Sequence, residues 1–336
     1  MSEPVRDRST AETLATIYAT IGEPLEEVQR RLDKLLRSPY EGVDEMLTHV
    51  SGYHGKRMRP AMALLVGRAF GALGEDHIRL AMVVEILHTA TLIHDDIIDE
   101  ADVRRQAPSV NRRFGNERAV LLGDFLFSEA FHLAVQFDDP EVRIAVSQLC
   151  RDICLGEILE VIHRFDLDLG EELYVDIIHR KTALLFETGA ALAARLGGAD
   201  ADTVTRLGEF ARYLGLAFQV VDDCLDLVGE EAVTGKSLGN DLAHGMTTMP
   251  VIHFLREATP ESRETLRKLL EEDARSVAER RADIRDLLRD SGAIDSAYRV
   301  ADDWVARSRS ALDAVPPSPM RQALVEALDF VVRRIC

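Results

Sequence analysis

Residues 76–99 read DHIRLAMVVEILHTATLIHDDIID, and this stretch predicts the class of fold. Its apolar side chains surround the whole circumference of the helix that it predicts, which is typical of a helix at the centre of a bundle. Three aspartates follow the apolar run near the C-terminal end. The helix dipole disfavours acidic side chains there, so their placement is costly unless a cation binds.

The rest of the chain shows the same helical periodicity. No sustained two-residue alternation bounded by turn residues occurs, so no sheet is expected. We therefore predict one all-α domain, a large helical bundle, over residues 13–336, preceded by a disordered arm over residues 1–12. The further predicted helices lie at about 24–36, 117–137, 141–163, 171–196 and 202–228.

Composition excludes several classes of protein. The 336 residues carry 58 acidic and 40 basic side chains, a formal net charge of −18, which argues against nucleic acid as a partner. No uncharged apolar stretch reaches the roughly 18–20 residues that a transmembrane segment requires. The N-terminus lacks the apolar core of a signal peptide, and four cysteines are too few for a disulfide scaffold. We expect a cytoplasmic protein.

One acidic pattern, D-D-x-x-D, occurs twice, as DDIID at 95–99 and DDCLD at 222–226. Each copy follows an apolar run, so each is expected near the C-terminal end of a buried helix. Like charges four residues apart share a helix face and repel. Mg²⁺ removes that repulsion, because it prefers carboxylate oxygens together with substrate phosphates. We expect the two motifs to face a central cavity and to grip a diphosphate through metal ions. The candidate metal ligands are Asp95, Asp96, Asp99, Asp222, Asp223 and Asp226.

Basic residues stand out in this acidic chain. The turn GKRMRP covers residues 55–60, Arg104 and Arg105 follow the first acidic motif, Lys181 lies in a predicted helix, and Lys236 follows the second motif. Phosphate oxygens are natural partners of such cations. Any one of these residues fits a surface ion pair, whereas the whole set fits a diphosphate site better.

With these motifs in this order, the chain resembles the trans-type isoprenyl diphosphate synthases, also called polyprenyl synthetases, from about Gly55 to Pro250. The resemblance implies head-to-tail transfer of a prenyl group, in which isopentenyl diphosphate condenses with an allylic diphosphate. It further implies Mg²⁺ as the cofactor and a homodimer. Besides the turn at residues 55–60, the segments that carry the resemblance are HDDIIDEADVRR at 94–105, GDFL at 123–126, GE at 156–157, RKT at 180–182, FQVV at 218–221, GK at 235–236 and GNDL at 239–242.

The resemblance also implies a role for each candidate residue. Asp95, Asp99 and Asp222 would hold magnesium, supported by Asp96, Asp223 and Asp226. Isopentenyl diphosphate would be bound by Lys56, Arg59, His88 and Arg105. The allylic diphosphate would be bound by Arg104, Lys181 and Lys236, and Thr182 and Gln219 would line the reacting centre.

Such a reaction requires no nucleophilic side chain. Metal ions and arginines stabilise the departing diphosphate, which lets the allylic carbon–oxygen bond ionise. The alkene of isopentenyl diphosphate then attacks the cation, and a proton is lost to the released diphosphate. An apolar pocket keeps water from quenching the cation.

Two positions depart from the family pattern. Relatives usually carry a lysine where this chain has Met246, so one cationic contact to the allylic diphosphate is expected to be missing. Glu160 stands where relatives often have glutamine.

Product length is predicted from the helix that carries the first motif. The growing chain is expected to run along it away from the aspartates, where short-chain relatives usually have an aromatic floor. Here Ala90 and Thr91 are small, which predicts a long product, from heptaprenyl to decaprenyl diphosphate. Leu87 and Phe131 are candidates for a deeper floor. A short-chain synthase that makes farnesyl or geranylgeranyl diphosphate is the alternative.

Three functions of another class compete. Glu-x-x-His pairs at 85–88, 129–132 and 160–163 match the spacing of di-iron bundles but leave the aspartate motifs without a role. The pair at 94–95, with His54 upstream, resembles the metal-binding residues of helical phosphohydrolases, which leaves the second motif unused. A regulatory subunit without turnover is expected to lose aspartates from the motifs, and all six are present.

Overall fold

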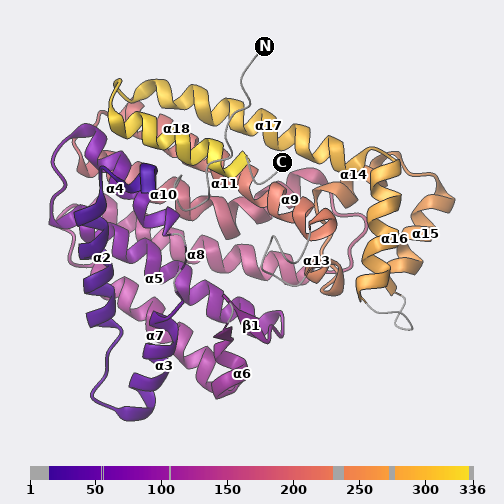
Figure 1. The fold of residues 1–336 in the computed structure, drawn as a ribbon, viewed down its shortest axis with the longest axis horizontal. Helices are drawn as coiled ribbons and strands as arrows, with labels where there is room; N and C mark the ends of the chain where they lie inside the picture. The colour runs from indigo at the N-terminus through magenta and orange to yellow at the C-terminus, as the bar shows by residue number, and fades with distance from the viewer. Residues whose placement is uncertain are drawn as a thin grey trace.

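The structure, a computed structural model, describes residues 15–53, 55, 57–105, 107–229, 238–271 and 277–332. The all-α prediction is confirmed, because helices build almost all of this part of the chain (Figure 1). The disordered arm predicted over residues 1–12 lies outside the described residues. The first helices are α2 (Gly22–Leu35), α3 (Glu41–Ser51), α4 (Met58–Phe70), α5 (Glu75–Ile98), α6 (Val110–Phe114), α7 (Asn116–Ala134) and α8 (Pro140–Ile162).

The remaining elements continue the bundle and add a helical lobe at one end. In Figure 1, α15 and α16 lie at the end opposite α2 and α3, while α17 and α18 run along one side. These elements are α9 (Glu171–Ile178), the π-helix η1 (His179–Ala183), α10 (Leu184–Leu196), α11 (Ala201–Val228), α13 (Asn240–Ala243), α14 (Met249–Glu257), α15 (Pro260–Glu271), α16 (Val277–Asp290), α17 (Ala293–Ala311), the 3₁₀-helix η2 (Leu312–Ala314) and α18 (Pro319–Val332).

Two long helices, α5 and α11, position the acidic motifs. α5 packs against α4, α7 and α10, and α11 packs against α10, α17 and η1. Most side chains of α5 between Ile78 and Ile93 are buried, as expected for a helix that is apolar on every side. Because both helices are held by neighbours along most of their lengths, the aspartates at their C-terminal ends are fixed in position.

The structure differs from the sequence prediction in two places. The helix predicted over residues 171–196 contains the π-helix η1, a single wide turn of the kind often found at functional sites. The helix of the first motif ends at Ile98, within one residue of its predicted end, and Glu100 beyond it adopts a left-handed conformation with φ of 47°. A short antiparallel hairpin follows, although no sheet was expected: β1 (Val103–Arg104) pairs with β2 (Ala107–Pro108).

None of the helices in the described ranges combines the length and the hydropathy that crossing a membrane requires. The cytoplasmic location stays a prediction from the sequence.

Candidate active site

The first acidic motif lies at the end of α5, where each aspartate has different surroundings. Asp95 is largely buried, and its Oδ1 accepts no hydrogen bond from any described residue. Asp96 is fully buried and accepts two hydrogen bonds from Arg104, the Nε bond at 2.8 Å. Asp99 forms an ion pair with Arg164, with 2.6 Å between Nη2 and Oδ1. Asp95 Oδ1 and Asp96 Oδ2 are therefore both buried carboxylate oxygens without a hydrogen-bond donor among the described residues, but Asp96 is already paired with Arg104 through its other oxygen.

Lys181 brings a cation to Asp95 from the π-helix. Its Nζ lies 3.8 Å from Asp95 Oδ1 and also contacts two glutamates of α8, 2.9 Å from Glu157 Oε2 and closer still to Glu160. Burial opposes the charge on Lys181, but these three carboxylates more than offset it, so the pKa of Lys181 lies well above its ordinary value. Lys181 is therefore a protonated cation surrounded by an excess of carboxylate.

The glutamates of α8 show that negative charge is in surplus here. Burial raises the pKa of Glu157 to about 8, and the nearby charge of Asp95 adds to the shift although Lys181 opposes it. Oε2 of Glu157 is in contact with Lys181, but its other carboxylate oxygen, Oε1, has no hydrogen-bond partner among the described residues. Burial likewise raises the pKa of Glu160, against the effect of Lys181. One lysine therefore does not neutralise the carboxylates around it, and a further cation would be accommodated.

The next residue of the π-helix, Thr182, reaches the second acidic motif. Its hydroxyl donates to Gln219 Oε1 at 2.8 Å, and Gln219 Nε2 donates to Asp223 Oδ1 at the same distance. The hydroxyl of Tyr174 donates to the other oxygen of Asp223. Burial raises the pKa of Asp223 to about 7, against the effect of these hydrogen bonds. Consecutive residues of one π-turn thus contact one acidic motif directly and the other through a single glutamine.

Two glycines allow this turn to lie between α8 and α11. A Cβ atom added to Gly215 of α11 would lie 2.6 Å from the Cα of Ala183. One added to Gly156 of α8 would lie 2.9 Å from the backbone nitrogen of Lys181. Both distances are shorter than van der Waals contact, so only glycine lets the two helices approach η1 this closely.

The second acidic motif lies near the end of α11. Asp222 is half-buried, Asp223 is buried as described, and Asp226 accepts backbone N–H groups from Gly239 at 3.0 Å and from Asp241 at 3.2 Å. Burial raises the pKa of Asp241 well above its ordinary value, and the charges of the motif add to the shift. Asp226 therefore organises the segment that follows the motif, which brings another carboxylate to the site.

A cluster of arginines surrounds His88, which lies before the first motif on α5. Arg59 donates to His88 Nε2 at 3.1 Å, and its guanidinium lies 4.5 Å from the ring centre of Phe186. Burial and the charges of four arginines lower the pKa of His88 well below its ordinary value, so this histidine is neutral near pH 7. His88 thereby acts as an acceptor that orients Arg59.

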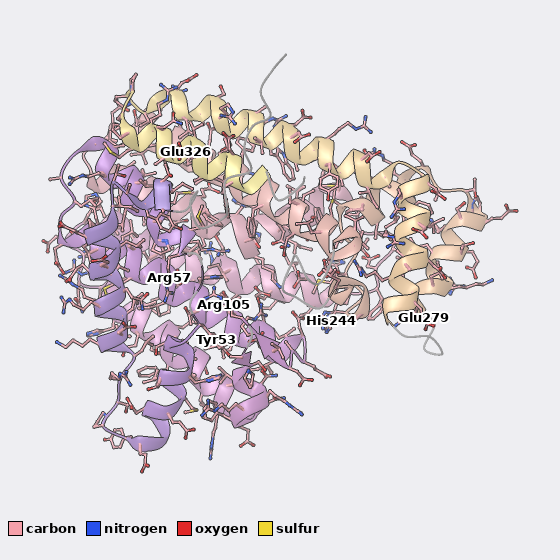
Figure 2. The ribbon with its side chains drawn as sticks, viewed as in Figure 1. Tyr53, Arg57, Arg105, His244, Glu279 and Glu326 are labelled. Carbon is pink, nitrogen blue, oxygen red and sulfur yellow. The ribbon has the colours of Figure 1, made fainter. Side chains whose placement is uncertain are left out.

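The other arginines of the cluster are held just as closely. Arg105 donates to the backbone oxygen of Tyr53 and covers Gly55, where an added Cβ would lie 2.5 Å from the guanidinium. Arg57 forms a buried ion pair with Glu85. Figure 2 labels Tyr53, Arg57 and Arg105, which lie near one another beside the hairpin. Burial and the neighbouring arginines lower the pKa of Arg105, so the cluster favours an anionic ligand.

The structure brings most of the predicted residues together, in two adjoining groups. The acidic group around η1 contains Asp95, Asp99, Lys181, Thr182, Gln219, Asp222, Asp223 and Asp226, and the cationic group contains Arg59, His88 and Arg105. The pair of Asp96 and Arg104 joins the two groups. Lys56 and Lys236 lie outside the described residues. Of the candidates for chain length, Leu87 and Ala90 are fully buried and Thr91 is half-buried, whereas Phe131 is exposed.

Sequence reasoning assigned no role to several residues of the site. Glu157 and Asp241 lie in segments that carry the resemblance, and their proximity to the aspartates could have been suspected on that basis. Tyr174 and Arg164 reach the motifs from positions 49 and 65 residues away in sequence. No local pattern signals such contacts.

This helical bundle combines two acidic motifs with an adjoining cationic cluster. Comparison with known proteins identifies the class of protein that has these features. The family model for polyprenyl synthetases matches residues 41–287. The chain belongs to this family and is a prenyltransferase.

Particular relatives match over nearly the whole chain. The octaprenyl diphosphate synthase of Escherichia coli is 32% identical over 326 residues, which cover 97% of each chain. The structure of a decaprenyl diphosphate synthase from Rhodobacter capsulatus has a TM-score of 0.90 at 31% identity, covering 96% of this chain and 99% of that one. A polyprenyl synthase from Caulobacter crescentus, complexed with calcium and isoprenyl diphosphate, has the same TM-score and identity, covering 96% and 98%.

The contacts leave little support for a di-iron site. Glu85 and His88 pair with Arg57 and Arg59, while Glu160 pairs with Lys181. His163 pairs with Asp166 at 2.9 Å. Among the described residues, no three histidine, cysteine or acidic side chains are placed to hold a metal ion by themselves, which is true of these pairs and of the two acidic motifs alike. Both side chains in two of the three Glu-x-x-His pairs are thus engaged by neighbours, and membership of the family selects the prenyltransferase.

Proposed function

We propose that this chain condenses isopentenyl diphosphate head-to-tail with an allylic diphosphate in the presence of Mg²⁺ and makes a long-chain all-trans polyprenyl diphosphate. One observation carries the proposal: the π-turn that bears Lys181 and Thr182 reaches both acidic motifs. A diphosphate held between those motifs would have a cation and a hydroxyl beside it. The names of the relatives support the same reaction class.

The donor set fits a hard divalent cation. Asp95 offers a buried carboxylate oxygen without a hydrogen-bond donor among the described residues, and burial foremost, with the charges of neighbouring carboxylates added, raises the pKa values of Glu157 and Asp223. Carboxylate oxygens completed by water and substrate phosphate are the surroundings that Mg²⁺ prefers. Asp95, Asp99 and Asp222 would hold the metal, which supplies charge stabilisation for the departing diphosphate.

The residues of the chain would bind and orient the two substrates. Lys181, kept protonated by its neighbours, would contact the allylic diphosphate together with Arg104. Arg59 and Arg105, with His88 as a neutral acceptor, would bind isopentenyl diphosphate in the arginine cluster. Because α5 carries His88 two turns before Asp95, the two substrates would lie side by side along one helix.

The chemistry then follows from charge. The allylic carbon–oxygen bond breaks, and its electron pair leaves with diphosphate, whose growing charge is stabilised by the fixed cations. The alkene of isopentenyl diphosphate forms the new carbon–carbon bond with the allylic cation. A proton is then lost to the released diphosphate, which restores a double bond. The fully buried side chains behind the motif on α5 include Leu87 and Ala90, and surroundings of this kind exclude water from the cation.

Ala90 supports the long product. It is fully buried in the core five residues before Asp95, where an aromatic side chain would shorten the space along α5. The enzyme is therefore expected to extend its product beyond twenty carbons.

Incubation with Mg²⁺, isopentenyl diphosphate and several allylic primers, followed by chromatography of the products, tests both parts of the proposal. We expect heptaprenyl to decaprenyl products from the wild type and farnesyl or geranylgeranyl products from Ala90→Tyr. Overpacking of the core costs about 1–3 kcal/mol, so thermal unfolding and a second variant, Thr91→Tyr, control for loss of fold. A wild type that stops at farnesyl diphosphate would refute the long-chain prediction, and one that turns over no primer would favour a regulatory subunit.

We also propose that the enzyme is a homodimer formed through α7 and α8. Large apolar side chains are exposed along both helices, with successive spacings of 4 and 10 residues in the first stripe and of 11, 3 and 4 residues in the second, all close to whole numbers of helical turns, so each stripe marks one helix face. They are Leu121 and Phe125 of α7 with Val135 directly after its last residue, and Ile144, Leu155, Ile158 and Ile162 along α8. Each stripe is about 20–27 Å long at 1.5 Å per residue. Two extended apolar stripes on adjacent helices fit a second copy of the same chain.

Charges placed on these stripes are expected to separate the copies. Light scattering should give about twice the chain mass of 37.4 kDa for the wild type, and the chain mass for the double variant Leu121→Glu, Ile158→Glu. Tyr40→Glu, at an exposed residue before α3, is the control and should stay dimeric. A wild-type monomer, or a dimer that survives both charges, would rule out this interface.

A further inference from the structure

Arg164 lies just after α8, outside every motif that the resemblance uses, and yet it contacts the first acidic motif. Its Nη2 donates to Asp99 Oδ1 at 2.6 Å. The side chains of Arg164 and Asp99 are only 19% and 25% exposed, so solvent screens their interaction less than that of a surface pair. This contact places an additional cation beside a predicted metal ligand.

The guanidinium of Arg164 has unused donors. Nη1 reaches the backbone oxygen of Ile98 only at 3.5 Å, the limit of a hydrogen bond. Nε is buried and has no hydrogen-bond partner among the described residues. A buried donor without an acceptor is costly. Arg164 therefore has the capacity to bind an anion in addition to Asp99.

The backbone around Arg164 is held firmly in place. Phe165 has a left-handed φ of 61°, and its N–H donates to the oxygen of Gly245 at 2.7 Å. The ring of Phe165 covers Gly245, where an added Cβ would lie 2.5 Å from the ring. The hydroxyl of Thr247 donates to the oxygen of Asp166 at 2.9 Å. These contacts fix the position from which Arg164 extends toward Asp99.

The other cations of the acidic group are already engaged. Lys181 contacts three carboxylates, and Arg104 uses Nε and Nη2 on Asp96. Next to the Phe165–Gly245 hydrogen bond, position 246 carries the uncharged side chain of Met246. Among the described residues, Arg164 is thus the cation on Asp99 with donors to spare.

We propose that Arg164 is a diphosphate-binding residue that exchanges partners. In the free enzyme it neutralises Asp99. When a divalent cation takes the Asp99 carboxylate, the guanidinium is released to donate to the oxygens of the allylic diphosphate. This inference rests on the proposed function and adds a residue to its diphosphate site.

The proposal predicts effects of opposite sign on two ligands. In Arg164→Leu, removal of the competing cation should tighten binding of Mn²⁺ alone at least three-fold, measured by electron paramagnetic resonance. The same variant should bind a non-ionising allylic thiolodiphosphate about ten-fold more weakly at saturating Mg²⁺, measured by calorimetry. Arg164→Lys, which keeps the charge, should bind the analogue within about three-fold of the wild type. These expected fold-changes assume the usual strength of a charge-assisted hydrogen bond.

A matched ion pair provides the control. Arg195 pairs with Asp139 at the other end of α8, also at 2.6 Å, so Arg195→Leu should change neither affinity. If Arg164→Leu weakens the binding of both ligands, the role of Arg164 is structural. If the variant changes neither affinity, the ion pair with Asp99 is incidental. Either result overturns the proposal. Both readouts are binding measurements, so they remain informative if no condensation is detected, and the proposal and the proposed function can fail separately.

Discussion

Asp95→Asn is expected to lower kcat/KM for prenyl transfer by about 100- to 1,000-fold while the fold is retained. Asp95 has a buried carboxylate oxygen, Oδ1, that accepts no hydrogen bond from the described residues and lies 3.8 Å from Lys181 Nζ. Asparagine keeps the size of the side chain but removes the charge that a divalent cation and Lys181 require. Initial rates of condensation, with circular dichroism for the fold, measure the effect.

A neighbouring aspartate supplies the control. Asp102 belongs to the same acidic segment, but it lies beyond the end of α5, is exposed, and pairs with Arg112 at 3.4 Å on the surface. Exposed pairs of this kind contribute little to stability, so Asp102→Asn should behave as the wild type. Equal losses in the two variants would show that the acidic segment acts through its overall charge, which contradicts the site described above.

Gly215→Ala is expected to lower kcat about 100-fold, although the glycine is not predicted to touch a substrate. The added methyl group would lie 2.6 Å from the Cα of Ala183, so the π-turn must move away from α11. Lys181 and Thr182 would move with it, and a displacement of about 1 Å in positioning groups can cost about 100-fold in rate. Single-turnover condensation rates measure the effect, and thermal unfolding separates it from a loss of stability.

Gly208→Ala on the same helix is the matched control. A Cβ there would lie 3.6 Å from the nearest atom, which is ordinary van der Waals contact. Alanine is also the better helix former, by about 0.5–1 kcal/mol, so this variant should be slightly more stable and fully active. An active Gly215→Ala enzyme would show that the close approach of α11 to η1 is not needed for catalysis.

Most of the acidic site could be anticipated because its residues lie within short motifs. Asp95 and Asp222 belong to repeated patterns on apolar helices, and the resemblance supplied Lys181, Thr182 and Gln219. The π-turn could not be anticipated, because residues 171–196 show ordinary helical periodicity and the wide turn arises from packing against two glycines. The neutral state of His88 was also hidden, since it depends on burial and on arginines from other segments of the chain.

Periodicity and short-range charge patterns are properties of neighbouring residues, so the amino-acid sequence alone predicts the helical architecture, the approximate bounds of the six helices named above and the two acidic motifs. The packing of the helices, by contrast, sets which charges meet: Lys181 with three carboxylates, Arg104 with Asp96, and Arg164 with Asp99. Coulomb interactions and desolvation depend on distance in space and on burial. Both quantities are set by how distant helices pack, and local sequence does not contain them.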